Sequence, residues 1–209
     1  MTGWHFPVTA SEVLHVGKVL AVRVDTVVMP GGRPAAREVV EAFGAVAIVP
    51  VDDDDGTVVL VDQYRPAVAR RLRELPAGLL DAAGEDPART AQRELAEETG
   101  FEAREWSLLC DVCPSPGFTD ESVRVYLARG LTEVGRPAGE DDEESDLHVV
   151  RVPLDEAVRA ALGGGIVNGV TVAGLLAARA VLDGVAEPRP LDAPWPTRPT
   201  RFAARRERA

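Results

Sequence analysis

Cysteine is scarce in this sequence of 209 residues, which has only Cys110 and Cys113. Because no second pair exists, a structural zinc site with four cysteine ligands is excluded. A thioredoxin-like motif begins a helix, whereas C-D-V-C continues an apolar, strand-like stretch whose alternation places the two side chains on opposite faces. We therefore expect two reduced, structural cysteines, as is usual in the cytoplasm.

Long apolar runs are also missing. The longest one near the C-terminal end, residues 170–182, is too short to span a membrane and contains Arg179. The first residues, MTGWHFPVTASE, lack the basic end and the apolar core of a signal peptide. These absences predict a soluble, cytoplasmic protein with no membrane partner.

An excess of positive charge is missing as well. The net charge of −11 argues against a general nucleic-acid binder, which is usually basic. Two acidic runs, residues 52–55 and 140–144, supply much of the negative charge, and the ordinary interpretation of such runs is solvated loops. The apolar content of 45% is enough for one sizeable core.

Alternating and valine-rich segments predict strands. The turn PGGRP joins two of them, residues 19–29 and 38–43, into a hairpin near the N-terminus. Further strands are expected at residues 44–51, 57–63, 106–112, 123–131 and 147–152. Because helices do not alternate regularly with these strands, a mixed sheet is favoured over a doubly wound parallel sheet.

Helix signals are clearest around Asp86, a good N-cap that is followed by proline at the first helical position. Ala88, Ala91 and Leu95 then form an apolar stripe, and Gly100 is a natural stop. Two more helices are expected at about 154–162 and 170–182. The tail, residues 186–209, is rich in proline and arginine and is either an extended arm packed on the body or on a partner, or disordered.

Three glutamates, Glu94, Glu97 and Glu98, crowd the helical segment RELAEETG. Like charges three and four residues apart share a helix face and repel, so a positive partner is expected there. Carboxylate oxygens at this spacing suit a hard divalent cation, Mg²⁺ or Mn²⁺. The ordinary alternative is an exposed helix face with ion pairs, such as one between Arg93 and Glu97.

The preceding segment RELPAGLLD extends this interpretation. Gly78 allows the backbone to approach a ligand closely, and the carbonyl of Ala77 can then supply another oxygen.

At these residues the sequence resembles the Nudix hydrolases. The family motif is glycine, five residues, glutamate, seven residues and then R-E-U-x-E-E-x-G-U, where U is bulky and apolar. Its matching residues here are Gly78, Glu85, Arg93, Glu94, Leu95, Glu97, Glu98, Gly100 and Phe101. The first gap holds six residues instead of five, which leaves the loop path between Leu79 and Gly84 open.

The wider chain is similar to the ADP-ribose pyrophosphatase branch of that family. The similar segments are VDQYRP, LPAG, GGGIVNGVTVAGLLAA and SPGFTDE, whose Pro116 lies fifteen residues beyond Phe101. The resemblance implies an α/β/α sandwich with a mixed sheet, preceded by an N-terminal antiparallel β region. It implies three regions: residues 1–43 for dimerisation and substrate completion, 44–185 as the Nudix domain, and 186–209 as the tail.

The resemblance also implies chemistry. ADP-ribose and water would give AMP and ribose 5-phosphate with Mg²⁺ or Mn²⁺ as cofactor. Glu94 and Glu98 would ligate the metal beside the Ala77 carbonyl, and Glu97 would join when more than one ion is bound. Glu85 would support the site by pairing with Arg93 or capping the helix. In this branch the general base lies on a loop after the motif, where GEDDEESD offers Glu143 or Glu144, with Glu143 slightly preferred.

Substrate contacts follow from the same resemblance. Arg65 would bind phosphate oxygens bidentately, although a plain surface arginine is the alternative. The other implied substrate-binding residues are Arg37 and Glu38, which complete the adenosine site of a partner subunit, together with Gly78, Pro116, Gly117 and Phe118. The branch implies a homodimer with exchanged N-terminal segments.

Two other functions stay open at this point. One is a Nudix hydrolase for another nucleotide sugar, such as ADP-glucose or GDP-mannose. The other is a Nudix-like module that binds ADP-ribose without cleaving it. Retention of Glu94, Glu97 and Glu98 speaks against the second, because a pure sensor has no need of a metal cluster.

Overall fold

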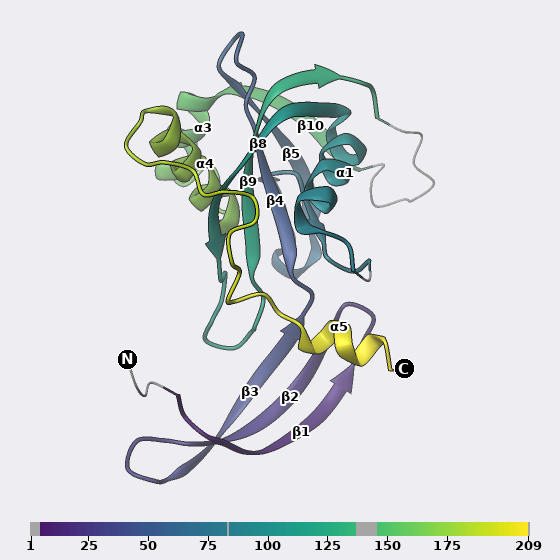
Figure 1. The fold of residues 1–209 in the computed structure, drawn as a ribbon, viewed down its shortest axis with the longest axis vertical. Coiled ribbons are helices and arrows are strands. Elements are labelled where there is room, and N and C mark those ends of the chain that lie inside the picture. The colour runs from purple at the N-terminus through teal and green to yellow at the C-terminus, as the bar shows by residue number, and fades with distance from the viewer. Residues whose placement is uncertain (1–4, 83, 137–145, 209) are drawn as a thin grey trace. The chain divides into compact units, whose positions relative to one another are not determined.

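The structure, a computed structural model, describes residues 5–82, 84–136 and 146–208. It divides into two compact units (Figure 1). The large unit comprises Ala45–Val112 and Val123–Pro196, and the small unit comprises Met1–Gly44, Cys113–Ser122 and Thr197–Ala209.

The large unit holds a four-stranded sheet with the strand order β7-β4-β9-β8. These strands are β4 (Ala45–Pro50), β7 (Ala77–Leu79), β8 (Phe101–Val112) and β9 (Val123–Glu133). β4 runs parallel to β9 and antiparallel to β7, and β8 is antiparallel to β9. The prediction of a mixed sheet is therefore confirmed.

A second, antiparallel sheet of the large unit has the order β10-β5-β6. Its strands are β5 (Thr57–Arg65), β6 (Arg70–Glu74) and β10 (His148–Pro153). A 3-10 turn, η1 (Pro66–Val68), joins β5 to β6. β6 was not predicted, because its sequence RRLRE is mostly charged and carries no apolar alternation.

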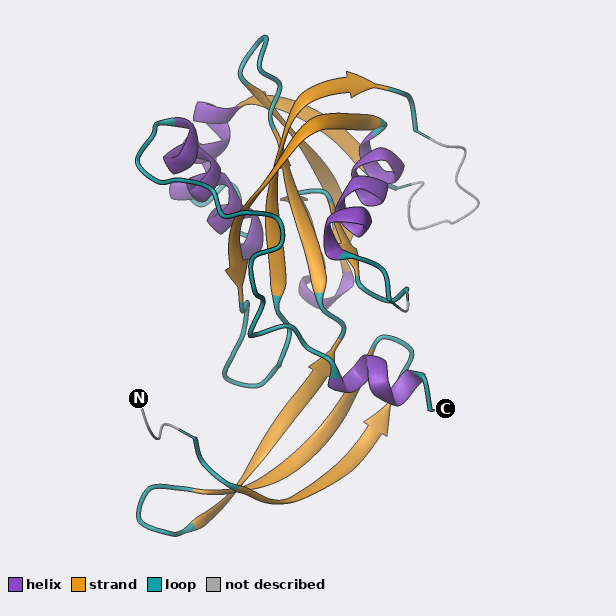
Figure 2. Cartoon of the chain, viewed as in Figure 1, coloured by secondary structure: helices purple, strands orange, loops and turns teal. Residues whose placement is uncertain are grey.

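Helices cover both faces of the four-stranded sheet, with α1 (Pro87–Thr99) on one side and α3 (Leu154–Leu162) and α4 (Gly169–Leu182) on the other (Figure 2). Side chains of a strand alternate between its two faces. In β4, Ile48 accordingly joins the apolar cluster that contains Leu95 of α1, whereas Val49 joins the cluster that contains Leu175 of α4. This arrangement is the predicted α/β/α sandwich.

The ends of α1 form as the sequence predicts. The side chain of Asp86 accepts hydrogen bonds from the backbone N–H groups of Ala88 and Arg89, and Pro87 opens the helix. Gly100 ends it with a φ of 75°, a left-handed conformation that favours glycine. The helix that bears the three glutamates therefore has well-defined limits.

The small unit is a three-stranded antiparallel sheet of β1 (Val8–Val16), β2 (Leu20–Val28) and β3 (Pro34–Ala42), with the short helix α5 (Arg201–Arg206). The hairpin of β2 and β3 confirms the predicted one. β1 and α5 were not predicted. Every residue of β1 is exposed, so the strand has no buried face to impose an apolar alternation on its sequence.

A small core holds α5 to this sheet. Phe202 packs edge-on against Phe43, with ring centroids 4.7 Å apart, and both contact the cluster that contains Ala21. Beside them the fully buried carboxylate of Glu41 pairs with Arg23 and Arg205. The final part of the tail is therefore an integral piece of the small unit.

The earlier part of the tail packs on the large unit as an extended arm, one of the two arrangements that the sequence left open. Leu108 and Arg189 exchange two backbone hydrogen bonds, of 3.1 and 2.8 Å. The guanidinium of Arg189 also pairs with Asp111 at 2.8 Å. Among the described helices, none has the length and apolar character needed to cross a membrane.

Candidate active site

Gly78 and Glu94 form the tightest contact of the candidate site. A Cβ placed on Gly78 would lie 2.1 Å from the carboxyl carbon of Glu94, which is far inside van der Waals contact. Glycine at this position lets the Glu94 carboxylate lie directly against the backbone of β7. Gly78 was predicted to let the backbone approach a ligand closely. In the structure, the group that lies close to this backbone is the side chain of Glu94 from α1.

Glu98 binds the same backbone segment one helical turn further on. Its Oε2 accepts a hydrogen bond of 2.9 Å from the N–H of Ala77. The carbonyl of Pro76 accepts a bond of 2.9 Å from Ile48 of the central strand β4. The segment that carries the Ala77 carbonyl is therefore held by both α1 and β4.

Arg93 connects the acidic residues of the helix. Its guanidinium lies 2.9 Å from Glu94 Oε1, 2.7 Å from Glu97 Oε2 and 3.4 Å from Glu85 Oε2. The hydroxyl of Thr90 donates a further hydrogen bond of 2.9 Å to Glu85. The two pairings predicted for Arg93, with Glu97 and with Glu85, are present.

Burial sets the electrostatics of Glu94, whose side chain is 15% exposed. Burial raises the pKa of Glu94 to about 7, and the neighbouring charge of Glu97 adds to the rise, while Arg93 opposes it. A carboxylate that is costly to ionise gains from a nearby cation. In the described part of the chain, however, no three His, Cys, Asp or Glu side chains already converge as a metal site, because Arg93 engages Glu97 and Ala77 engages Glu98.

The donor set nevertheless fits a hard divalent cation. Glu94, Glu97 and Glu98 offer carboxylate oxygens on consecutive turns of one helix. The backbone of Ala77 lies next to Glu98, to which it is hydrogen-bonded. Oxygen ligands of this kind suit Mg²⁺ and Mn²⁺. Holding such a cation requires the glutamates to rotate from their present partners.

Arg65, the predicted phosphate partner, lies at the end of β5 and is held by Glu74 of β6. Its Nε and Nη2 lie 3.1 and 2.7 Å from the two oxygens of that carboxylate. The Glu74 side chain is 4% exposed and that of Arg65 is 45% exposed, so the acid is buried and half of the arginine faces solvent. Sequence reasoning missed Glu74, although it directly precedes the LPAG segment.

The remaining predicted substrate residues belong to the small unit. Arg37 and Glu38 lie on β3, and Pro116, Gly117 and Phe118 lie on the segment 113–122. The carbonyl of Phe118 accepts a hydrogen bond of 2.7 Å from Val40 of β3, and the phenyl ring is exposed. The structure thus brings these two predicted segments side by side within that unit.

Glu143 and Glu144, the predicted base residues, lie outside the described residues. Asp146, which follows them, pairs with Arg71 of β6 at 2.7 Å. The two cysteines are free, and burial raises the pKa of the Cys110 thiol, as expected for a structural cysteine.

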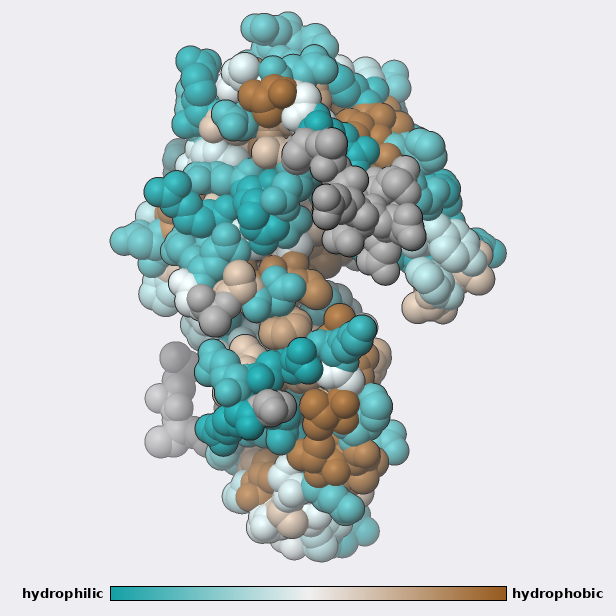
Figure 3. Space-filling view, turned by 90° about the vertical axis from the view of Figure 1, so that its right-hand side faces the viewer, coloured by the Kyte–Doolittle hydropathy of each residue, from teal (hydrophilic) through white to brown (hydrophobic). Residues whose placement is uncertain are grey.

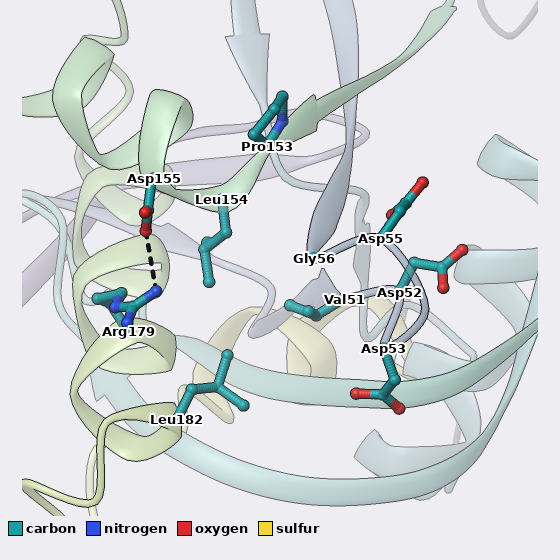
Figure 4. Close-up of a pocket in the computed structure, with 10 residues that line it drawn as sticks. All are labelled: Val51, Asp52, Asp53, Asp55, Gly56, Pro153, Leu154, Asp155, Arg179 and Leu182. Carbon is teal, nitrogen blue, oxygen red and sulfur yellow. Dashed lines mark hydrogen bonds and ion pairs between the residues drawn. The ribbon is translucent and has the colours of Figure 1, made fainter.

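A pocket of about 370 Å³ lies elsewhere on the large unit, between the turn at residues 52–56 and the helices α3 and α4 (Figure 4). Its charged side chains are already paired: Arg179 binds Asp155 at 2.9 Å, and Arg151 contacts Asp52 and Asp55. None of the predicted site residues lines this pocket. The acidic turn is therefore an ion-paired surface loop.

Comparison with known proteins agrees with this fold. A solved structure described as an ADP compounds hydrolase superposes with a TM-score of 0.75, covering 89% of this chain and 98% of that chain at 23% identity. The layered α/β arrangement is thus shared with an enzyme structure.

The NUDIX domain family matches residues 41–168, and the chain belongs to the Nudix family of hydrolases. An ADP-ribose pyrophosphatase of Mycobacterium tuberculosis is 56% identical over 201 residues, 96% of both chains. A methanol dehydrogenase activator of Bacillus methanolicus is 39% identical over 149 residues, 71% of this chain and 79% of that protein.

Proposed function

We propose that this Nudix hydrolase cleaves ADP-ribose to AMP and ribose 5-phosphate with a divalent cation. The observation that carries the proposal is the close packing of Glu94 and Glu98 of α1 against the Ala77–Gly78 backbone. The choice of substrate is supported by the pyrophosphatase from M. tuberculosis, because its similarity extends over nearly the whole of both chains, including the small unit and the tail.

Mg²⁺ or Mn²⁺ would be held by Glu94, Glu98 and the Ala77 carbonyl, and Glu97 would join when more than one ion is bound. When bound, it neutralises the charge of the diphosphate, polarises its phosphoryl oxygens and makes a water more acidic. The protein positions the groups. Arg93 offsets the repulsion between the carboxylates until the cation binds, and Gly78 leaves room for the Glu94 carboxylate beside the backbone.

Arg65, whose side chain is 45% exposed, binds a phosphate oxygen of the substrate. Glu74 orients its guanidinium, since a planar guanidinium presents its N–H groups in a rigid fork. Glu143 or Glu144 removes the proton of the attacking water. Glu85 supports the site through Arg93 and Thr90.

The small unit completes the substrate site of a partner subunit in a cytoplasmic homodimer. Arg37 and Glu38 contact the adenosine. Phe118 and Thr119 line the ribose end, beside the substrate-binding residues Pro116 and Gly117. Support comes from β1, an edge strand whose exposed apolar residues are Val8, Val13, Leu14 and Val16, part of the hydrophobic surface of the three-stranded sheet (Figure 3). An exposed apolar edge strand is ready to pair with another chain. Light scattering of the eluting protein gives its mass: a dimer supports this arrangement, and a monomer contradicts it.

Product analysis tests the reaction. The purified protein is incubated with ADP-ribose, ADP-glucose or GDP-mannose, with Mg²⁺ or with EDTA, and the products are separated by ion-exchange chromatography. AMP and ribose 5-phosphate in equal amounts, formed fastest from ADP-ribose and only with metal, support the proposal. Faster cleavage of another nucleotide sugar assigns the protein to that substrate instead. Tight ADP-ribose binding without turnover identifies a non-hydrolytic binding module.

A further inference from the structure

Leu75–Gly78, the segment that carries the candidate metal-binding carbonyl, crosses from one face of the large unit to the other. Leu75 packs in the apolar cluster under α4, whereas Leu80, just beyond the segment, packs in the cluster under α1. Both helices therefore contact the same short piece of backbone. The function proposed above uses only the contacts from α1.

Each residue of this segment is held by a different group. Gly78 faces Glu94, Ala77 donates its N–H to Glu98, and the Pro76 carbonyl accepts from Ile48. The fourth contact comes from α4: the N–H of Leu75 donates a hydrogen bond of 3.0 Å to the hydroxyl of Thr171. Leu75 and Thr171 are 2% and 1% exposed, so water does not replace this bond.

The hydroxyl of Thr171 is itself oriented by Asn168, the N-cap of α4. Asn168 Oδ1 accepts from the backbone N–H of Thr171 at 2.9 Å and from its hydroxyl at 3.1 Å. A hydroxyl has one proton to donate, and Asn168 receives it, which leaves a lone pair of Thr171 for the Leu75 N–H. The cap of α4 thus fixes the direction of the bond to Leu75.

One turn further along α4, Gly174 permits close packing on the same residue. A Cβ on Gly174 would lie 2.6 Å from Cδ1 of Leu75. The helix therefore contacts both the backbone and the side chain of Leu75, and the segment cannot shift along the helix without losing one contact.

We propose that Asn168 and Thr171 are positioning residues, which place the Ala77 carbonyl and the backbone facing Glu94 and Glu98 for metal binding. The inference rests on the metal site of the proposed function. Groups that orient metal ligands without touching the metal commonly change metal affinity about 10–100-fold when removed. Removing the Thr171 hydroxyl would also leave the buried Leu75 N–H without a partner.

Isosteric substitution tests the role. Thr171→Val keeps the shape and removes the hydroxyl, whereas Thr171→Ser keeps the hydroxyl. Asn168→Ala removes the cap oxygen, whereas Asn168→Asp keeps one. Val181→Ala, near the far end of α4, is the matched control, because it loosens the packing of the helix without touching the segment.

Mn²⁺ binding is measured by electron paramagnetic resonance on protein without substrate, and the thermal midpoint is recorded for each variant. We expect Thr171→Val and Asn168→Ala to weaken Mn²⁺ binding about 10-fold, and the serine and aspartate variants to stay within about twofold of wild type. Val181→Ala should lower the thermal midpoint and leave Mn²⁺ binding unchanged.

The inference is overturned when Thr171→Val binds Mn²⁺ like wild type, or when Val181→Ala weakens binding equally, since either result describes a purely structural helix cap. If Thr171→Val does not fold, the comparison of Asn168→Ala with Asn168→Asp decides. If the variants show this pattern of Mn²⁺ binding but the wild-type protein does not cleave ADP-ribose, the proposed function is refuted and the positioning role is still supported.

Discussion

Glu94 and Gly78 lie so close together that the carboxyl group occupies the space of the missing side chain: a Cβ on Gly78 would approach it to 2.1 Å. The Glu94 carboxylate can occupy this space beside the backbone only because residue 78 has no side chain. The glycine of the Nudix motif therefore has a steric role beside the helix that bears the three glutamates.

Gly78→Ala should therefore displace the Glu94 carboxylate and lower kcat by roughly 10²-fold, because a misplacement of about 1 Å costs that much in a preorganised site. Gly165→Ala is the control, since a Cβ there would meet its nearest neighbour at an ordinary 3.5 Å. Steady-state rates of AMP formation compare the two. A Gly78→Ala enzyme with wild-type kcat would show that the close contact is irrelevant to catalysis.

Glu98→Gln should nearly abolish turnover, with a loss of about 10²-fold or more, because the amide cannot supply the negative charge that a divalent cation needs. Its amide oxygen can still accept the hydrogen bond from Ala77, so circular dichroism and the thermal midpoint should stay close to wild type. Glu102→Gln, an exposed glutamate on β8, serves as the control. Activity within about threefold of wild type contradicts the metal assignment.

Glu143→Gln and Glu144→Gln should differ sharply, because the proposed mechanism assigns the role of general base to one of these two residues. We expect the larger fall in kcat for Glu143→Gln, by about 10²-fold or more, with KM for ADP-ribose little changed. Rates measured from pH 6 to pH 9 distinguish the base from a bystander. Two variants with wild-type kcat would move the base to another segment.

Arg205→Met should destabilise the small unit at neutral pH by about 1–3 kcal/mol, because it removes one of the two arginines that form ion pairs with the buried carboxylate of Glu41. The hydrogen bond from Arg205 holds the pKa of Glu41 below its ordinary value of 4.5. Because the pKa of Glu41 is lower in the folded state, its ionised carboxylate stabilises the fold at pH values above 4.5. This contribution is lost as the pH falls through the folded-state pKa.

Urea unfolding of wild type and of Arg205→Met, at pH 7 and at decreasing pH, measures the difference in their free energies of unfolding. The gap between wild type and Arg205→Met should narrow steadily once the pH falls below about 4.5. Arg206→Met, at the next and exposed position of α5, should follow the wild-type curve. A gap that stays constant down to pH 3 would show that Arg205 acts through packing and not through charge.

Much of the large unit was predictable from local sequence. β4 and the first half of β9 are buried on both faces and are mostly apolar in sequence. The limits of α1 are indicated by Asp86, Pro87 and Gly100. The ion pairs of Arg93 also follow from spacing, since residues four apart share a helix face. These features depend on neighbours in the chain, which a sequence shows directly.

Other elements have no local signal. β1 is exposed throughout, β6 is mostly charged, and α5 is short, so none of them displays an apolar period. Each forms because another segment provides its partner. The neighbouring strand β2 pairs with β1, β5 pairs with β6 across a short turn, and the core around Phe43, remote in the chain, holds α5.

The sequence by itself therefore indicated the class of chemistry through the resemblance of its motif to the Nudix hydrolases, and the spacing of Glu94 and Glu98 placed their acidic oxygens on one helix face. The tertiary structure decided which side chains hold the groups around that helix face in place. Glu74 reaches Arg65 only after β5 and β6 pair, and Thr171 reaches Leu75 from 96 residues away only after α4 packs on the sheet. The first contact depends on the register of two neighbouring strands, and the second joins residues remote in the chain. No local pattern records which buried N–H will meet which hydroxyl.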